Sequence, residues 1–230
     1  DTNARVAGRL GGNPALPAEL VDLAIQDGRA AMLRSLAHSQ VPTEDQLARM
    51  VATADSSVLC ALASRATLPP HLLRQLVDRE DWKSGRIVAG RKELPLELAM
   101  HIATMPQIAG GLFSGDSRRD WPPTVLAQAL ASTAGDPAPS AACRFVLSGL
   151  ACQQYVTPEQ LLLVWQQTPE NAGTVVRSSH APDALIHEIA NALLARPEEF
   201  PHHVAKAMVP RLDPVLLDQL RSRAQHEMQR

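Results

Sequence analysis

Histidines are the first residues of this chain that could hold a metal ion. His202 and His203 are adjacent, and His187 lies on the segment before them. Three neutral imidazoles can bind zinc. Adjacent residues on a helix, however, point about 100° apart, and no HExxH or paired CxxC spacing accompanies them. We therefore expect surface histidines near the start of a helix and no metal site.

The three cysteines could in principle act as nucleophiles, metal ligands or disulfide partners. Cys143 and Cys152 lie nine residues apart, and Cys60 is distant from both. A metal pair or a disulfide at 143 and 152 is one interpretation, but buried structural thiols are favoured because three scattered cysteines form no framework. No local signature supplies a base for a nucleophilic cysteine. Reduced thiols are typical of the cytoplasm, which is the location we expect.

Two tracts combine basic and aromatic side chains, 79–93 and 115–121. Arginine and tryptophan are enriched at binding hot spots, and tryptophan can also stack on a nucleic-acid base beside phosphate-binding arginines. Five acidic residues are interleaved, so a solvated face with weak internal ion pairs is an equally open interpretation. The candidate partner-binding residues are Trp82, Arg86, Arg91, Lys92, Arg118, Arg119 and Trp121.

Composition excludes several functional classes. The chain has 230 residues, 45% hydrophobic and only 3% aromatic, with a net charge of −2. Helix-forming aliphatic residues dominate, so strands rich in aromatic residues are not expected. The charge gives no overall attraction to nucleic acid or anionic lipid, and no apolar run is long enough to cross a bilayer. No phosphate-binding glycine loop, nucleophile elbow or kinase signature is present, so we expect no enzyme and no cofactor.

A proline-led apolar stripe recurs along the whole chain. Small or aliphatic residues stand at the third, fourth and seventh positions after the proline, which is one face of a helix. The stripes follow Pro17, Pro69, Pro95, Pro122, Pro158, Pro182 and Pro201, and Pro42 leads a variant whose stripe starts two residues late. When Pro42 is counted with them, successive marker prolines lie 24–36 residues apart as far as Pro182, and the last gap, to Pro201, is 19 residues.

One unit shows how the pattern is expected to fold. In residues 68–93, Pro69 suits the start of a helix, a turn is expected at 81–85, and a second apolar patch follows at 86–89. Gly90 is expected to end that patch in a left-handed conformation. In the variant unit, Thr43 and Gln46 have the spacing of a capping box.

Such units cannot bury their apolar faces alone, but a stack of them can. The sequence therefore predicts an all-α solenoid of about seven to eight short units, in a single domain over 1–230. Residues 1–14 are expected to be a partial repeat, 132–140 an inserted loop or hinge, and 201–230 a C-terminal cap. An ordinary helical domain rich in proline is the alternative.

The runs VAGRLGGNPALPAELVDLA, LPPHLL and LPLELA resemble the leucine-rich repeat variant family. The similarity covers residues 4–131 and, less closely, 156–190, with the Leu-Pro start matched at Leu16–Pro17, Leu68–Pro69 and Leu94–Pro95. The resemblance implies a right-handed superhelix of alternating α and 3₁₀ helices and brings no catalytic residues. One member carries an iron–sulfur module held by clustered cysteines, and this chain has no such cluster. HEAT-type units, at about 40 residues or more, fit the spacing less well.

The pattern as a whole favours binding over catalysis. We expect a non-enzymatic scaffold that binds another protein through an extended face of the repeat stack. One alternative is a nucleic-acid-binding helical-repeat protein, with or without glycosylase-like chemistry, that uses the same basic and aromatic tracts. A second alternative is a regulatory segment of a larger enzyme. No membrane partner is expected.

Overall fold

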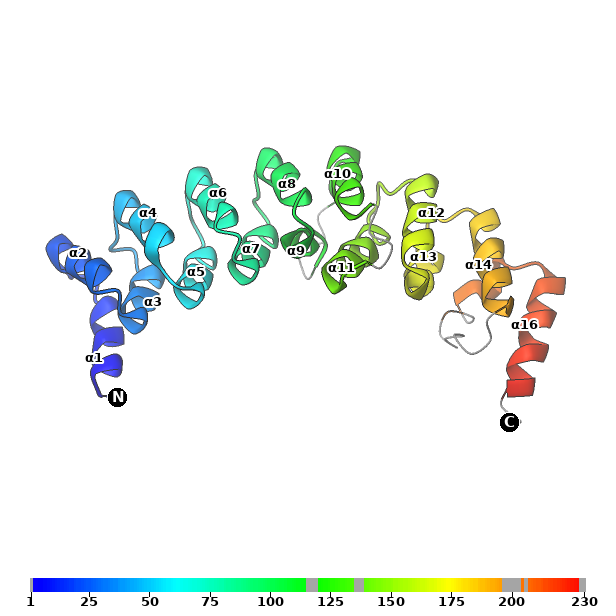
Figure 1. Cartoon of the computed structure of the whole chain (residues 1–230), viewed down its shortest axis with the longest axis horizontal. Helices are drawn as coiled ribbons and strands as arrows, with labels where there is room; N and C mark the ends of the chain where they lie inside the picture. The colour runs from blue at the N-terminus through cyan, green and yellow to red at the C-terminus, as the bar shows by residue number, and fades with distance from the viewer. Residues whose placement is uncertain (1, 115–119, 135–138, 196–203, 205–206, 228–230) are drawn as a thin grey trace. The chain divides into compact units, whose positions relative to one another are not determined.

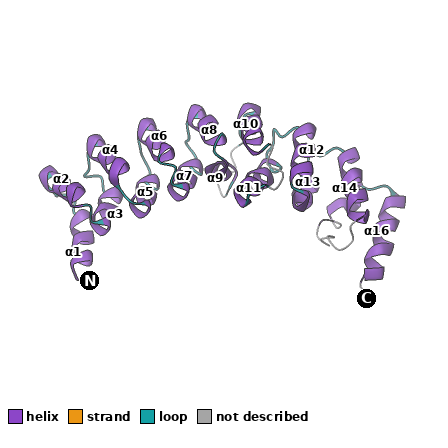
Figure 2. Cartoon of the chain, viewed as in Figure 1, coloured by secondary structure: helices purple, strands orange, loops and turns teal. Residues whose placement is uncertain are grey.

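The computed structural model of the chain describes residues 2–114, 120–134, 139–195, 204 and 207–227. These residues form α-helices and short 3₁₀ helices and contain no strand (Figure 2). The expected all-α class is therefore confirmed. The chain divides into two compact units, Asp1–Ser117 and Arg118–Arg230. Arg118, Arg119, His202 and His203 lie outside the described residues.

The first unit contains two alternating sets of helices. The first set follows the marker positions: α2 (Ala18–Asp27), α4 (Glu44–Thr53), α6 (Pro70–Asp78) and α8 (Leu96–Ala103). The second set comprises α1 (Thr2–Gly11), α3 (Ala30–His38), α5 (Ser56–Ala63), α7 (Trp82–Ala89), α9 (Pro106–Ala109) and the 3₁₀ helix η1 (Gly110–Phe113).

Helices of the second set pack mainly on one another, whereas α6 and α8 of the first set also pack on α7 and α9. In the second set α1 packs on α3, α3 on α5, α5 on α7, and α7 on α9 and η1. In the first set α2 packs on α4 and α4 on α6. Within this unit the two sets form two rows (Figure 1). The inner helices α3, α4, α5 and α7 therefore contribute one face to the preceding helix of their row and another to the following one.

Proline and threonine fix where the first-set helices begin. Pro17, Pro69 and Pro95 are the N-cap residues of α2, α6 and α8, where a missing N–H leaves no hydrogen bond unmade. At α4 the expected capping box is confirmed. The backbone N–H of Thr43 donates to Gln46 Oε1 at 2.9 Å, and the N–H of Gln46 donates to Thr43 Oγ1 at 3.3 Å.

The expected turn at 81–85 is wrong, because α7 already begins at Trp82. Asp81 caps this helix by accepting a hydrogen bond from the Ser84 N–H at 2.8 Å, so the acidic residue starts a helix instead of a turn. Gly90 was also expected to be left-handed, but its φ is −78°. The left-handed glycine is Gly28, with φ of 70°, at the end of α2.

The proline-led stripes form the core of the first unit, with one exception. After Pro69 and Pro95 the residues at the third, fourth and seventh positions are all buried: Leu72, Leu73, Leu76, Leu98, Ala99 and Ile102. After Pro17, Val21 and Ala24 are buried, but Leu20 is 42% exposed. The stripe positions after Pro69 and Pro95 are thus all buried, and Leu20 in the N-terminal helix pair is the exception.

In the second unit, helices again begin at or directly after a marker proline. It contains α10 (Pro123–Thr133), α11 (Ala141–Leu150), α12 (Pro158–Gln167), η2 (Pro169–Asn171), α13 (Ala172–Arg177), α14 (Asp183–Ala195), η4 (Val209–Arg211) and α16 (Pro214–Glu227). Helices α10 and α11 pack together, α12 packs on η2 and α13, and α14 packs on α16. Trp165 in α12 is 8% exposed, which confirms its expected place in the core.

The segments singled out as irregular have the following structure. Residues 132 and 133 complete α10, residues 135–138 lie outside the described part, and α11 begins after its N-cap Ser140. In the region expected to be a cap, Arg211 binds back to the start of α14 through the Asp183 carboxylate and the Ala181 carbonyl. No helix in the described part of the chain is long and apolar enough to cross a membrane.

Candidate partner-binding surface

The first turn of α7 presents the most exposed tryptophan of the described residues. Trp82 directly follows the capping residue Asp81 and is 50% exposed. The ammonium of Lys83 lies 5.6 Å from the centroid of the indole ring, within the range of a cation–π contact. Half-buried Arg86 and exposed Ile87 follow one turn later, so all four side chains share one side of the helix. We call Trp82, Lys83, Arg86 and Ile87 the α7 face.

The α7 face replaces small residues of the neighbouring helices. A shift of 26 residues aligns α7 with α5, and a second shift aligns it with α3. The positions of Trp82 and Lys83 are then Ser56 and Ser57 in α5, and Ala30 and Ala31 in α3. An aromatic and a cationic side chain therefore occupy two positions that carry small residues in α5 and α3. Packing between repeats does not require large side chains at these positions.

Groups beneath the α7 face are held in one protonation state. Burial would raise the pKa of Asp81, but hydrogen bonds from Ser84 and Ser56 outweigh it and lower the pKa below its ordinary value. The pKa of the Cys60 thiol is raised, first by burial and then by the charge of Asp81. The thiol is therefore kept protonated, which makes Cys60 a poor nucleophile.

Arg91 binds the preceding repeat with its guanidinium. Its Nη1 donates to the carbonyls of Ala63 at 2.9 Å and Arg65 at 2.6 Å, and its Nη2 donates to that of Ala66 at 2.8 Å. Burial lowers the pKa of Arg91. Its side chain thus caps the C-terminal end of α5, and its charge is directed into the protein.

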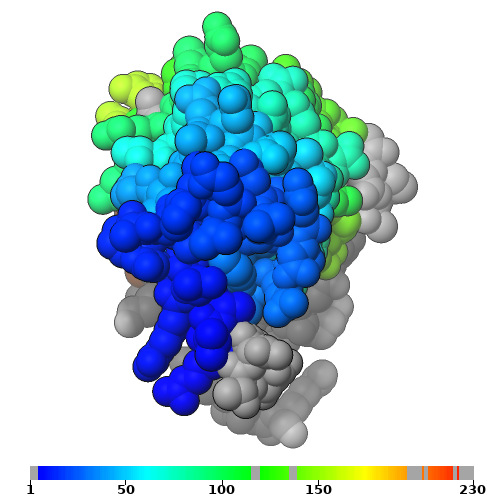
Figure 3. Space-filling view, turned by 90° about the vertical axis from the view of Figure 1, so that its left-hand side faces the viewer, coloured from blue at the N-terminus to red at the C-terminus, as the bar shows by residue number. Residues whose placement is uncertain are grey.

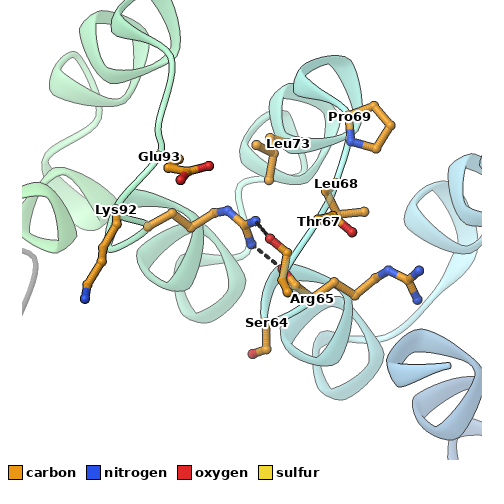
Figure 4. A pocket seen from close by; sticks show the side chains of 10 residues that line it. Ser64, Arg65, Thr67, Leu68, Pro69, Leu73, Lys92 and Glu93 are labelled. Carbon is orange, nitrogen blue, oxygen red and sulfur yellow. Dashed lines mark hydrogen bonds between the residues drawn. The ribbon is translucent and has the colours of Figure 1, made fainter. Parts of the chain in front are cut away.

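A pocket of 780 Å³ lies beside this contact (Figure 4). It is lined by the loop of residues 64–69 and by residues 91–93. Lys92 and Glu93 are exposed, and in Figure 4 the Lys92 side chain points away from Pro69 and Leu73. The pocket is an open groove between two successive loops, and Lys92 lies at its rim.

Trp121 lies in the core of the second unit. It is 2% exposed, and its backbone N–H donates to Gln153 Oε1 at 3.3 Å. Like Leu16 and Leu94, which are 6% and 2% exposed, it directly precedes a marker proline. Of the seven predicted residues, Trp82 and Arg86 share the α7 face, whereas Arg91 and Lys92 follow α7 and line the groove of residues 64–69 and 91–93. Trp121 is an internal residue of the second unit.

The remaining candidates for chemistry are His187 and the three cysteines. The Nδ1–H of His187 donates to the Asp183 carbonyl at 2.6 Å, and its Nε2 lies 3.3 Å from Asp213 Oδ2. Among the described residues, no three histidine, cysteine or acidic side chains form a group that could hold a metal ion. Cys143 is buried, Cys60 is half-buried and Cys152 is exposed, and all three are free thiols.

A second groove, of 560 Å³, lies in the second unit. Cys152 and His180 both line it, together with Asp120 and Arg177. The backbone N–H of His180 donates to Ser178 Oγ at 3.4 Å. Proximity along one groove does not activate a thiol, which needs a base within hydrogen-bond reach.

Sequence reasoning missed the contacts between repeats. Arg65 binds the carbonyls of Ala37 at 2.7 Å and of Ser39, as Arg91 does one repeat later. Arg79 Nη1 donates to the Ala52 carbonyl at 2.6 Å. The 26-residue spacing of Arg65 and Arg91 was the available signal, because it equals the repeat period.

Comparison with known proteins finds no family model, no curated protein and no solved structure that matches this chain.

Proposed function

We propose that this chain is a non-enzymatic helical-repeat solenoid that binds another protein through the α7 face. The observation that carries the proposal is the 50% exposure of Trp82 beside Lys83. Tryptophan and arginine are over-represented among the residues that dominate binding energy. The successive packing of α1, α3, α5 and α7 gives this face a rigid support, which lowers the entropy lost on binding.

The repeat architecture supports a scaffold role. In stacked repeats each unit contacts its neighbours, and the outward positions are free to vary without loss of packing. Trp82 and Lys83 of the α7 face occupy such positions, since their counterparts in α3 and α5 are alanine and serine. We also propose a cytoplasmic location, because Cys60, Cys143 and Cys152 are all free thiols.

A nucleic acid is the second candidate partner. Lys83 and Trp82 together could bind a phosphate and stack on a base. The net charge of −2 opposes this function, as do the acidic residues Glu80, Asp81 and Glu93 around the α7 face. A protein partner with an apolar side chain for Trp82 and acidic groups for Lys83 and Arg86 fits the mixed surface better.

Photo-crosslinking from the α7 face tests the proposal. A benzophenone amino acid is placed at position 82 or 83, and at the control position 163, where Leu163 is also exposed, at 42%, on α12. After irradiation in cells we expect a protease-sensitive adduct from 82 and 83 and none from 163. Absence of an adduct, or equal adducts at all three positions, would contradict the proposal. A nuclease-sensitive adduct would favour the nucleic-acid function, and its yield should fall steeply when salt is raised before irradiation.

A further inference from the structure

The N-terminal end of the first unit exposes four aliphatic side chains, and the repeat period assigns three of them, Val6, Leu10 and Leu20, to the core. Val6 and Leu10 in α1 are 60% and 44% exposed, and Leu20 and Leu23 in α2 are 42% and 57% exposed. Figure 3 looks onto this end, where α1 and α2 face the viewer. We call these four residues the end face.

The counterparts of Val6 and Leu10 in the next helices are buried. A shift of 26 residues places Val6 at Met32 and Leu10 at Leu36, which are 9% and 0% exposed. A further shift of 26 residues reaches Val58 and Leu62 in α5, both 0% exposed. Ala7 in α1 and its counterpart Leu33 in α3 are both buried, with 8% and 4% of their surface exposed. Helix α1 therefore has the same register as α3 and α5. It differs from them only in that the side carrying Val6 and Leu10 is exposed.

Leu20 shows the same contrast in the other row of helices. Its counterparts in the aligned stripes are Leu47, Leu72 and Leu98, which are 5%, 0% and 5% exposed. Helix α4 packs between α2 and α6, whereas α2 has no helix of its row before it. Leu20 is therefore exposed because, among the described helices, none packs on that side of α2.

A true end of a repeat stack is normally polar on its outer side, since an apolar end would expose a patch to water. In this chain the end face carries aliphatic residues at the same positions that form the interface between successive repeats. We propose that the end face is a stacking surface for a further helix pair of the same repeat type, bound as α1 and α2 are bound by α3 and α4.

The geometry favours this occupant over a second copy of the same end. Every contact between repeats joins the trailing side of one helix to the leading side of the next, as the packing of α1, α3, α5 and α7 shows. Two end faces would join two leading sides, which occurs nowhere in the described rows. The polar contacts have the same direction, since Gln46 Nε2 in α4 donates back to Asp22 Oδ1 in α2 at 2.9 Å.

A duplicated repeat tests the proposal directly. A second copy of residues 14–39 is inserted after Ser39, so that the inner copy of Leu20 follows a helix pair and the outer copy remains exposed. Leu20→Ser in the outer copy should leave the urea midpoint unchanged. The same change in the inner copy should alter the unfolding equilibrium constant by about 10- to 100-fold, the effect of losing one buried leucine. Leu47→Ser in the unmodified chain provides the reference value.

Two outcomes would overturn the proposal. If the extended chain fails to fold, or if both serine variants have the same midpoint, the end face does not accept a repeat. If sedimentation shows that the unmodified chain dimerises, and Leu20→Ser abolishes the dimer, the occupant is a second copy instead. Leu163→Ser is the control for both measurements, because Leu163 has the same 42% exposure on α12. A monomeric unmodified chain together with a sensitive inner Leu20 is the expected result.

Discussion

Arg91 donates a hydrogen bond from Nη1 to the backbone carbonyl of Arg65 at 2.6 Å, and Arg65 makes the equivalent contact to Ser39. Each guanidinium also reaches a carbonyl 28 residues earlier, Ala63 for Arg91 and Ala37 for Arg65. The last carbonyls of α3 and α5 have no partner within their own helices. The two arginines satisfy them from the next repeat and so fix the register between three successive units.

Replacing Arg65 should therefore destabilise the first unit. Arg65 is 8% exposed, and its removal leaves buried carbonyls without a donor, so Arg65→Ala should lower the free energy of unfolding by about 2–3 kcal/mol. Arg91→Ala should have a smaller effect because Arg91 is only half-buried. Urea unfolding followed by circular dichroism measures both.

The control for these arginines is Arg74→Ala. Arg74 forms an exposed ion pair with Asp78 on the same helix at 3.0 Å, and such pairs contribute less than about 0.5 kcal/mol. If Arg65→Ala were as mild as Arg74→Ala, the carbonyl contacts would not hold the repeats together.

Gly85 marks the closest approach between α7 and α9. A Cβ atom at this position would lie 2.6 Å from Cγ2 of Ile108, a branched side chain with little freedom to move. Gly85→Ala should lower stability by about 1–3 kcal/mol through overpacking, despite the better helix propensity of alanine. Thermal unfolding checks this value. Gly12→Ala is the matched control, since its nearest atom would be 3.7 Å away, and a stability loss there equal to that at Gly85 would contradict the explanation.

Acid should weaken the first unit through Asp55. Hydrogen bonds from the Ser57 hydroxyl at 2.8 Å and the Val58 N–H at 3.0 Å lower the pKa of Asp55 in the folded state. A lowered pKa stabilises the fold above the unfolded-state value, about 3.9. This contribution is lost as the pH falls through the folded-state value. The urea midpoint should therefore fall on acidification below about pH 5.

Two variants isolate this effect. Asp55→Asn keeps a cap acceptor but cannot titrate, so its urea midpoint should fall less steeply with acid than that of the unmodified chain. Ser57→Ala removes the leading hydrogen bond and should give an intermediate slope. Equal slopes for all three proteins would show that Asp55 does not contribute to the acid response.

Local rules predicted those parts of the fold that depend on residues close in sequence. The stripes after Pro69 and Pro95 and the Thr43–Gln46 capping box are of this kind, because spacing alone determines them. The start of α7 does not follow from the sequence alone, because aspartate at position 81 is favoured both in turns and as an N-cap.

Contacts between repeats were not predictable in the same way. The acceptors of Arg65 and Arg91 are backbone carbonyls, which every residue carries, so the sequence does not distinguish them. Trp121 was assigned to the surface from its type and its basic neighbours. Its position directly before a marker proline, shared with Leu16 and Leu94, was the better guide. For Trp82 no such constraint exists, and its place on the α7 face remains the basis of the proposed function.

The central claim is tested most directly by the affinity of the crosslinked partner for a Trp82→Ala variant. Hot-spot tryptophans contribute about 2 kcal/mol or more, so the dissociation constant should rise about 30-fold. Leu163→Ala, on the equally exposed control position, should change it by less than about twofold. An unchanged dissociation constant for Trp82→Ala, with the fold intact by circular dichroism, would contradict the assignment of the α7 face.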